Sequence, residues 1–405
     1  MPTAEAATRD LLRLTLTPGL GPILIGRAAQ ELGSYSAVID ASETALRRIR
    51  GIGEDRARSI SLGLRDSERA ADAELALAER LGVTLLALHD AAYPPLLKQV
   101  PDAPPVLYVR GRIDAAELDK YPIAIVGSRS CTAYGVEQSE RFAMGLAQAG
   151  LTIVSGGARG VDSAAHRAAM RVKGRTIAVL GCGLAHCYPP DNHDLFDTIA
   201  AGSGAVVSEL PLGSPPNAEN FPARNRIISA LSLGVLVIEA GRRSGALITA
   251  RVAVEEHGRE VFALPARVDS ASSVGSLELI KAGGAAMVTH PDDILAALES
   301  PARHAHGGTH EARFAPVQPE LGFENNGHGS PDSAPVAAST SAAGPRNAAL
   351  TTDQLAILEA LDEPRSLDDL ARLVSREPGA LRADITVLEI RRRLQRRGSL
   401  FERRA

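Results

Sequence analysis

The chain has 405 residues, a formal net charge of −4 and few aromatic residues, at 3%, with no tryptophan. A length of this order predicts roughly two or three domains. The mildly acidic balance excludes a protein that coats nucleic acid with its whole surface. Any nucleic-acid binding must therefore come from a local basic patch.

The cysteines Cys131, Cys182 and Cys187 are too few for a disulfide framework and show no paired spacing, which favours a reducing cytoplasm. The N-terminus, MPTAEAATRDLLRL, lacks the long apolar core of a signal peptide. No apolar run is long enough to span a bilayer. We therefore expect a soluble, cytoplasmic protein without membrane contact.

Residues 1–85 are expected to form a helical domain, because apolar residues recur at helical spacing and are interrupted by glycine-containing turns. Two turns, at Gly19 and Gly21 and at Gly51 and Gly53, each lead into a helix. They resemble the helix-hairpin-helix motif of SAM-like domains, whose turn amides contact DNA phosphates. Such domains also serve only for packing or protein contact, and the sequence leaves both roles open.

Residues 86–300 are predicted to form one Rossmann-like α/β domain. After an extended lead-in up to residue 122, apolar runs that suit buried strands alternate with amphipathic helical stretches. These runs are IAIVG (123–127), LTIVS (151–155), TIAVLG (176–181), AVVSE (205–209), VLVIEA (235–240) and VFALP (261–265). Strands buried on both faces and separated by helices indicate a doubly wound, mainly parallel sheet.

The last hundred residues divide into a linker and a small domain. Residues 301–347 are rich in glycine, proline, serine and alanine without periodicity, which is typical of a flexible linker. Residues 348–405 contain three short helical stretches and a terminal hairpin, the outline of a winged-helix-like domain. Its arginine cluster at 391–397 is either a nucleic-acid contact or a solvated tail.

Polar, glycine-rich loops follow five of the predicted strands: GSRSCTAYG (127–135), SGGARGVD (155–162), GCGLAHCYPPDN (181–192), ELPLGSPPNAENFPARNR (209–226) and AGRRSGALITA (240–250). All should open on the carboxyl-end rim of the sheet, where ligands bind in this fold class. Glycine permits close backbone approach, and helix N-termini supply amide donors. Arginines at 129, 159, 224 and 226 add positive charge there, as does Lys173 if the chain turns back toward the rim. Each glycine alone could serve only a tight turn, but several such loops on one rim favour an anion site.

These loops do not contain the sequence motifs that bind nucleotide cofactors. The first loop lacks the GxGxxG dinucleotide fingerprint, GCGLAH lacks its third glycine, and the Walker A pattern is absent. We therefore expect no cofactor.

Two arrangements of polar residues in the loops could suggest catalysis or metal binding. Asp162 and His166, with Ser155 and Ser163 nearby, could form a catalytic group, but no GxSxG elbow accompanies them, so capping and local bonding are preferred. The cysteines and histidines at 182–193 fit no standard zinc spacing, and we expect no metal there.

Taken together, the loops resemble those of the DNA-processing protein A family, the Smf proteins. The stretches SGGARGVDSAAH, SELPLGSPPNAENFPARNRIISALS and VIEAGRRSGALITARVAVEEHGREVFALPA occur in that family's order and spacing. The resemblance covers about residues 10–290 and implies a Rossmann-like domain that binds single-stranded DNA. It further implies a homodimer without enzymatic activity that acts in natural transformation, overcomes single-strand-binding protein and loads the RecA recombinase.

The resemblance also implies specific residues. By position in the matching motifs, the expected DNA contacts are Ser128, Arg129, Gly156, Gly157, Arg159, Lys173, Arg224, Asn225 and Arg226. The expected self-association surface contains Leu277, Ile280 and Met287. Three departures from the family pattern lie near that surface: Ala266 follows Pro265 in place of glycine, GSLELI lacks the usual asparagine, and AGGAA replaces EGA.

Two alternative functions compete with this hypothesis. One is a nucleotide-binding Rossmann enzyme or sensor, such as a nucleoside monophosphate hydrolase, whose PGGxGTxxE signature is missing here. The other is a transcription regulator that combines the C-terminal module with a ligand-sensing middle domain. Phosphate contact should outweigh base stacking in any nucleic-acid complex, because Phe221 and Tyr134 are the only aromatic residues expected near the loops.

Overall fold

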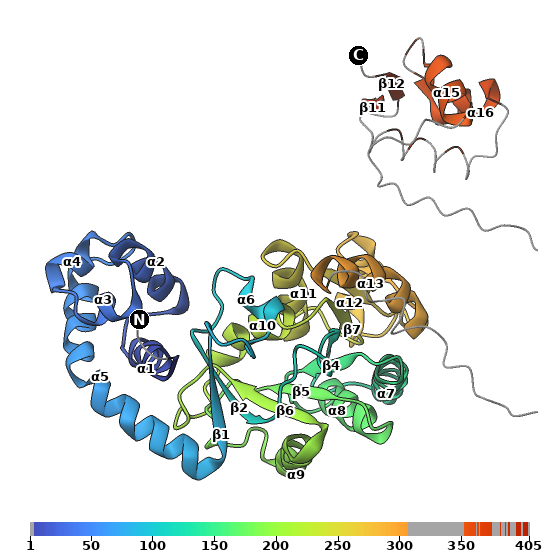
Figure 1. Ribbon diagram of the computed structural model, residues 1–405. Coiled ribbons are helices and arrows are strands. Elements are labelled where there is room, and N and C mark those ends of the chain that lie inside the picture. The colour runs from blue at the N-terminus through green and yellow to red at the C-terminus, as the bar shows by residue number, and fades with distance from the viewer. Residues whose placement is uncertain are drawn as a thin grey trace, which may run out of the picture. The chain divides into compact units, whose positions relative to one another are not determined.

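The computed structural model describes residues 4–306, 352–361, 363, 365–374, 381, 385, 388, 394–397 and 400–403. The chain divides into two compact units, Met1–Pro319 and Glu320–Ala405. The first unit opens with five helices: α1 (Ala4–Thr15), α2 (Pro22–Leu32), α3 (Tyr35–Ile39), α4 (Glu43–Arg48) and the long α5 (Glu54–Leu81) (Figure 1).

A nine-stranded sheet forms the centre of this unit. Its strands are β1 (Val83–Ala87), β2 (Val106–Gly111), β3 (Pro122–Val126), β4 (Thr152–Ser155), β5 (Thr176–Val179), β6 (Gly204–Ser208), β7 (Gly234–Val237), β8 (Glu260–Ala263) and β9 (Ala286–Met287). Between and after them come α6 (Pro95–Lys98), α7 (Ala133–Gln148), α8 (Val161–Arg171), η1 (Pro190–Asn192), α9 (His193–Thr198), η2 (Ile199–Ser203), α10 (Asn220–Ala230), α11 (Gly245–Glu255), α12 (Val274–Lys281) and α13 (Pro291–His306).

The strand order is β1-β2-β6-β5-β4-β3-β7-β8-β9, parallel from β6 to β9 and antiparallel at β1 and β2. The predicted Rossmann-like, mainly parallel sheet is thus confirmed, and the six predicted strands correspond to β3–β8. The segment before residue 122, predicted to be an extended lead-in to the sheet, in fact contributes to the sheet itself, because it contains β2 and the end of β1. The expected domain boundary after residue 85 falls inside β1.

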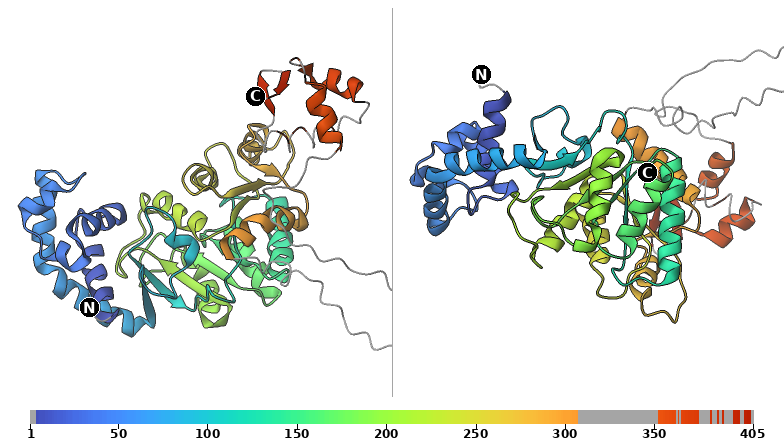
Figure 2. Two further views of the ribbon diagram at one scale, coloured as in Figure 1. Left: turned by 45° about the horizontal axis from the view of Figure 1, so that its top comes forward. Right: turned by 90° about the horizontal axis from the view of Figure 1, so that it is seen from below.

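Helices cover both faces of the sheet because successive strand residues point to opposite sides. In β3, Ile123 and Ile125 pack in the core formed with α7 and α8, whereas Ala124 and Val126 pack in the core formed with α10 and α11. Figure 2 shows these helices on either side of the strands. The continuous apolar runs of the sequence are therefore strands that are buried on both faces.

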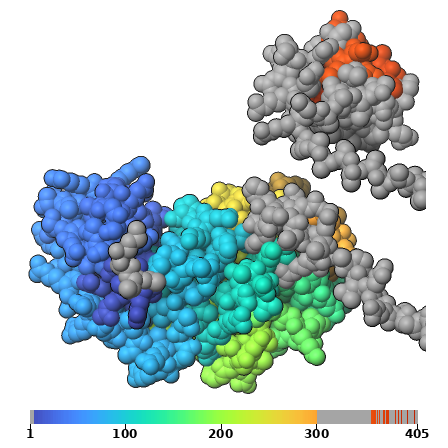
Figure 3. Space-filling model, in the orientation of Figure 1, coloured from blue at the N-terminus to red at the C-terminus, as the bar shows by residue number. Residues whose placement is uncertain are grey.

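The N-terminal helices share a hydrophobic core with the sheet. Leu11 of α1 and Ile60 of α5 belong to the same buried cluster as Val206 of β6 and Phe196 of α9. At this junction, Glu74 of α5 accepts a 2.6 Å hydrogen bond from the backbone amide of Leu212. In the space-filling view, these helices and the segment that follows them form one continuous surface (Figure 3).

In the second unit, the described residues include α15 (Thr352–Glu359), α16 (Leu367–Leu373) and the sheet β10-β12-β11. Strand β10 is Arg365–Ser366, and β11 (Leu394–Arg397) pairs antiparallel with β12 (Leu400–Arg403). The winged-helix assignment stays a prediction. Most of the expected linker, 307–347, lies outside the described residues, but 301–306 continue α13, so the linker was expected too early.

Among the described helices, none combines the length and the apolar character that a bilayer crossing requires.

Replacing Phe196 tests the shared core. Its side chain is 1% exposed, so we expect Phe196→Ala to lower the free energy of unfolding by about 3–5 kcal/mol because a cavity remains. Urea denaturation measures this loss, and the signals of the N-terminal helices and of the sheet should shift together. A loss below about 1 kcal/mol, or separate transitions of the two parts, would contradict the shared core.

Candidate nucleic-acid interface

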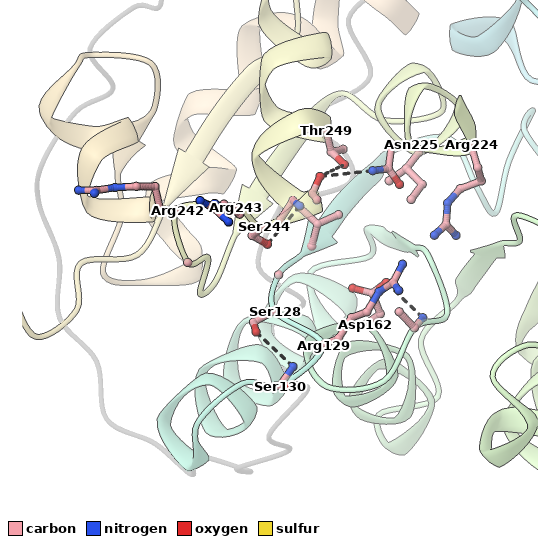
Figure 4. Close-up of a pocket in the computed structure, with 17 residues that line it drawn as sticks. Ser128, Arg129, Ser130, Asp162, Arg224, Asn225, Arg242, Arg243, Ser244 and Thr249 are labelled. Carbon is pink, nitrogen blue, oxygen red and sulfur yellow. Dashed lines mark hydrogen bonds between the residues drawn. The ribbon is translucent and has the colours of Figure 1, made fainter. Parts of the chain in front are cut away.

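A cavity of about 500 Å³ opens at the carboxyl ends of β3 and β7. The chain passes from β3 outward through β4, β5 and β6, then returns to place β7 on the other side of β3. The loops after β3 and β7 therefore diverge, which creates the crevice where ligands bind in open α/β sheets. The cavity is lined by residues 126–130, 158, 162, 224, 225, 228, 241–246 and 249 (Figure 4).

Positive charge surrounds this cavity. Arg129 follows β3, while Arg242 and Arg243 follow β7, and all three side chains are exposed. The N-terminus of α11 lies between them, where Ser244 caps the helix by accepting a 3.3 Å hydrogen bond from the amide of Ala246. Cations and a helix N-terminus together favour an anionic ligand.

Buried Glu239 fixes the loop that carries Arg129. Its carboxylate accepts hydrogen bonds from the amide of Thr132 at 2.8 Å and from the hydroxyls of Thr132 and Ser272 at 3.0 and 2.7 Å. Its backbone oxygen accepts a 2.7 Å bond from the amide of Ser128. One acidic side chain thus connects the loops after β3, β7 and β8.

Arg224, one of the expected DNA contacts, is bonded to the protein's own backbone. Although it lines the cavity, its side chain is only 5% exposed, and its guanidinium donates to the backbone oxygens of Gly156, at 2.6 Å, and Val179. Gly156 directly follows β4 and Val179 is the last residue of β5, so Arg224 holds these two parts of the rim together.

The charges of Arg224 and Asp162 balance within this buried region. Burial lowers the pKa of Arg224 to about 10, against the opposing effect of Asp162, so the guanidinium stays charged at neutral pH. Burial likewise raises the pKa of Asp162, opposed by Arg224 and by the amide of Ala158. Each group therefore limits the cost of burying the other.

Gly156 and Gly157, which the resemblance places among the DNA contacts, are enclosed by the protein's own side chains. A Cβ at Gly156 would lie 2.7 Å from the Arg224 guanidinium and from Asp162, and one at Gly157 would lie 2.7 Å from the ring of Phe196. Both glycines are buried, and Gly157 has a φ of +64°. Glycine is needed here because the protein's own side chains fill the space.

Two other expected cations lie away from the cavity. Arg226 is engaged by Asp102 at 3.1 Å and by Glu209, with 15% of its side chain exposed. Lys173 follows the last turn of α8 and precedes β5, which places it at the amino-terminal edge of the parallel strands. The chain does not turn back toward the rim there. Lys173, also an expected DNA contact, therefore lies at the edge of the sheet opposite the rim.

Arg159, Ser128 and Asn225 remain on the rim as expected. Arg159 is exposed and paired with Asp191 at 2.7 Å. Ser128 and Asn225 line the cavity, and the Asn225 side-chain amide donates a 3.3 Å hydrogen bond to the Gly245 oxygen.

His166 has a structural environment, in agreement with the preferred reading of the sequence. Its Nδ1 lies 2.6 Å from the hydroxyl of Thr176, and that hydroxyl donates to the oxygen of Ile153. Nδ1 therefore carries the proton. Burial lowers the pKa of His166 to about 3, so the ring is neutral. Across the described residues, no group of three or more His, Cys, Asp and Glu side chains is arranged to hold a metal ion.

An aromatic cavity of about 390 Å³ adjoins the first one and shares Arg129, Asn225 and Gly245 with it. Tyr188 and Phe221 line it with ring centroids 5.2 Å apart, and the Arg129 guanidinium lies 5.1 Å from the Phe221 ring. Of the two aromatic residues expected near the loops, Phe221 lies here, whereas Tyr134 lines a separate cavity. Tyr188 was missed.

The family model for DNA recombination-mediator protein A matches residues 84–299, over half of the chain. The chain belongs to this family. Protein Smf of Synechocystis is 42% identical over 282 residues, which cover 69% of this chain and 70% of that protein.

The chain also aligns with solved structures of DNA processing protein A. DNA processing protein A of Streptococcus pneumoniae aligns with a TM-score of 0.59 and 35% identity, covering 71% of this chain and 97% of that one. That of Helicobacter pylori, solved for its unique single-stranded DNA binding mode, aligns with a TM-score of 0.47 and 31% identity, over 53% and 95%.

The residues expected at the family's self-association surface differ in exposure. Met287, on edge strand β9, is 59% exposed. Leu277 of α12 is half-buried, whereas Ile280 packs partly against the core under α12. A partner could therefore reach Met287 most readily.

Replacing Arg224 tests its role in the rim. We expect Arg224→Met to lower the free energy of unfolding by about 3–5 kcal/mol, because two carbonyls lose their hydrogen-bond donor and Asp162 loses the buried positive charge near it. Urea denaturation measures the loss, and Asp162→Asn in the same background should restore part of it. A loss below about 1 kcal/mol would contradict this role.

Proposed function

We propose that the chain binds single-stranded DNA on the carboxyl-end rim of its sheet, as a non-enzymatic mediator of recombination. The observation that supports this most is the cavity between the β3 and β7 loops, where exposed Arg129, Arg242 and Arg243 surround the N-terminus of α11. Such a site attracts backbone phosphates without reading bases.

Single strands fit this surface better than duplexes for a physical reason. The aromatic cavity beside the phosphate cavity offers Tyr188 and Phe221 for stacking, and only an unpaired base can present its face to them. Arg129 borders both cavities, so one nucleotide can place its phosphate on one side and its base on the other.

The partners follow from the family resemblance and are part of the proposal. We propose that the bound strand is taken over from single-strand-binding protein and passed to the RecA recombinase, and that the chain acts as a homodimer through Met287 and Leu277. Because Cys131, Cys182 and Cys187 are free thiols, we place this function in the cytoplasm.

Hydrolysis of nucleoside monophosphates is the alternative activity, and an enzymatic assay with these substrates tests it.

Titration with labelled oligonucleotides tests the DNA site. We expect single strands to bind more tightly than duplexes of equal length, with affinity that falls steeply as salt rises. Arg129→Ala and Arg243→Ala should each weaken binding about tenfold, because a charge-assisted phosphate contact is worth roughly 1.5 kcal/mol or more.

Lys173→Ala is the matched control, since it removes an exposed cation at the opposite edge of the sheet. Its affinity should equal that of the unmodified protein. Equal affinity for single and double strands, or unchanged binding in both arginine variants, would refute the proposed site.

A further inference from the structure

The arginines of the rim fall into two groups. Arg129 and Arg243 are exposed, and neither forms an ion pair with any residue that the structure describes. Arg159 and Arg242 are exposed as well, but each is paired with a carboxylate: Arg159 with Asp191 at 2.7 Å, and Arg242 with Glu278 at 2.6 Å. Two of these four exposed arginines are therefore already paired with a carboxylate of the protein.

The residue next to Asp191 is anchored to the rim by its side chain. The neighbouring residue, Asn192, is 2% exposed and donates hydrogen bonds to the oxygen of Gly157 at 2.9 Å and to the hydroxyl of Ser163 at 2.8 Å. The carboxylate of Asp191 accepts from Arg159 Nε at 2.7 Å. Asp191 is thus positioned beside the glycine loop by its neighbour as well as by Arg159.

Glu278 is held in a similar way on the other side of the cavity. The start of α12 is fixed to the loop after β7, because the amides of Gly275 and Ser276 donate to the oxygen of Ala240 at 2.8 and 3.2 Å. Gly275 also packs so closely that a Cβ would lie 2.7 Å from the Gly241 oxygen. Glu278, on α12, is therefore held beside the loop that carries Arg242.

We propose that Asp191 and Glu278 are built-in competitors of the DNA phosphates, which lower the affinity of the rim for a single strand. This inference rests on the proposed function. Both ion pairs are open to water, with 62% and 64% of the side chains exposed in one pair and 73% and 52% in the other. Exposed pairs are weak, so a phosphate can replace the carboxylate, and the carboxylate can replace the phosphate again. Such exchange suits a protein that must hand its strand on.

Isosteric neutral variants test this inference. We expect Asp191→Asn and Glu278→Gln each to tighten single-strand binding about two- to fivefold at low salt. The salt dependence should become steeper by up to about 0.7 in the log–log slope for each arginine that is freed for a phosphate. Fluorescence anisotropy of the full chain with a labelled oligothymidylate measures both quantities.

A double-mutant cycle separates release of the arginine from a general change in charge. Arg242→Ala should change affinity less than twofold in the unmodified chain and more than threefold in the Glu278→Gln background. Arg159→Ala should behave in the same way with Asp191→Asn. Equal effects of the arginine substitution in both backgrounds overturn the proposal for that pair.

Glu140→Gln is the matched control for net charge. Glu140 pairs with Arg171 at 2.8 Å, with side chains 33% and 52% exposed, and Arg171 lies at the end of α8 that faces away from the rim. This variant should leave affinity unchanged, and tightening equal to that of Glu278→Gln overturns the proposal.

If the unmodified chain does not bind single strands, the proposed function itself fails. If it binds and both rim variants stay unchanged, only this inference fails.

Discussion

The buried guanidinium of Arg224 is the interaction on which the rim depends. It joins the carbonyl just after β4 to the last carbonyl of β5 and lies near Asp162 at the start of α8. A buried cation is tolerated only where carbonyl oxygens and an anion surround it. The guanidinium also constrains a neighbouring residue, because Gly156 must lack a side chain to leave room for it. The surface that meets DNA in our proposal is thus shaped by a charge that is itself almost hidden from solvent.

The charges on this edge of the sheet therefore have three different roles. Arg224 and Asp162 form the interior, and Arg226 joins Asp102 and Glu209 beside it. Arg129 and Arg243 are left open at the surface, whereas Arg159 and Arg242 are paired with carboxylates that water reaches. In our proposal, only the open arginines and the carboxylate-paired arginines can bind a phosphate. The paired arginines bind it less strongly, because a carboxylate competes for them. A count of arginines in the loops overstates the positive field of the site.

The sequence predicted the sheet well because strands buried on both faces leave continuous apolar runs, as in β3–β8. It predicted the rim, since glycine-rich loops follow those strands, but not which side chains face outward. Arg224 and Arg129 look alike in sequence, and only packing separates them. Arg242 and Arg243 were missed although AGRRSG was recognised as a rim loop, because their importance depends on β7 lying beside β3. Strand order is a long-range property that local patterns do not carry.

Locating a bound strand tests the central claim most directly. A short oligothymidylate photo-crosslinked to the full chain, followed by mass spectrometry of the peptides, would show which surface meets the bases. Our account predicts crosslinks to Tyr188 and Phe221, in the aromatic cavity that shares Arg129 with the phosphate cavity. Crosslinks confined to the N-terminal helices, or to the amino-terminal edge of the sheet near Lys173, would contradict it.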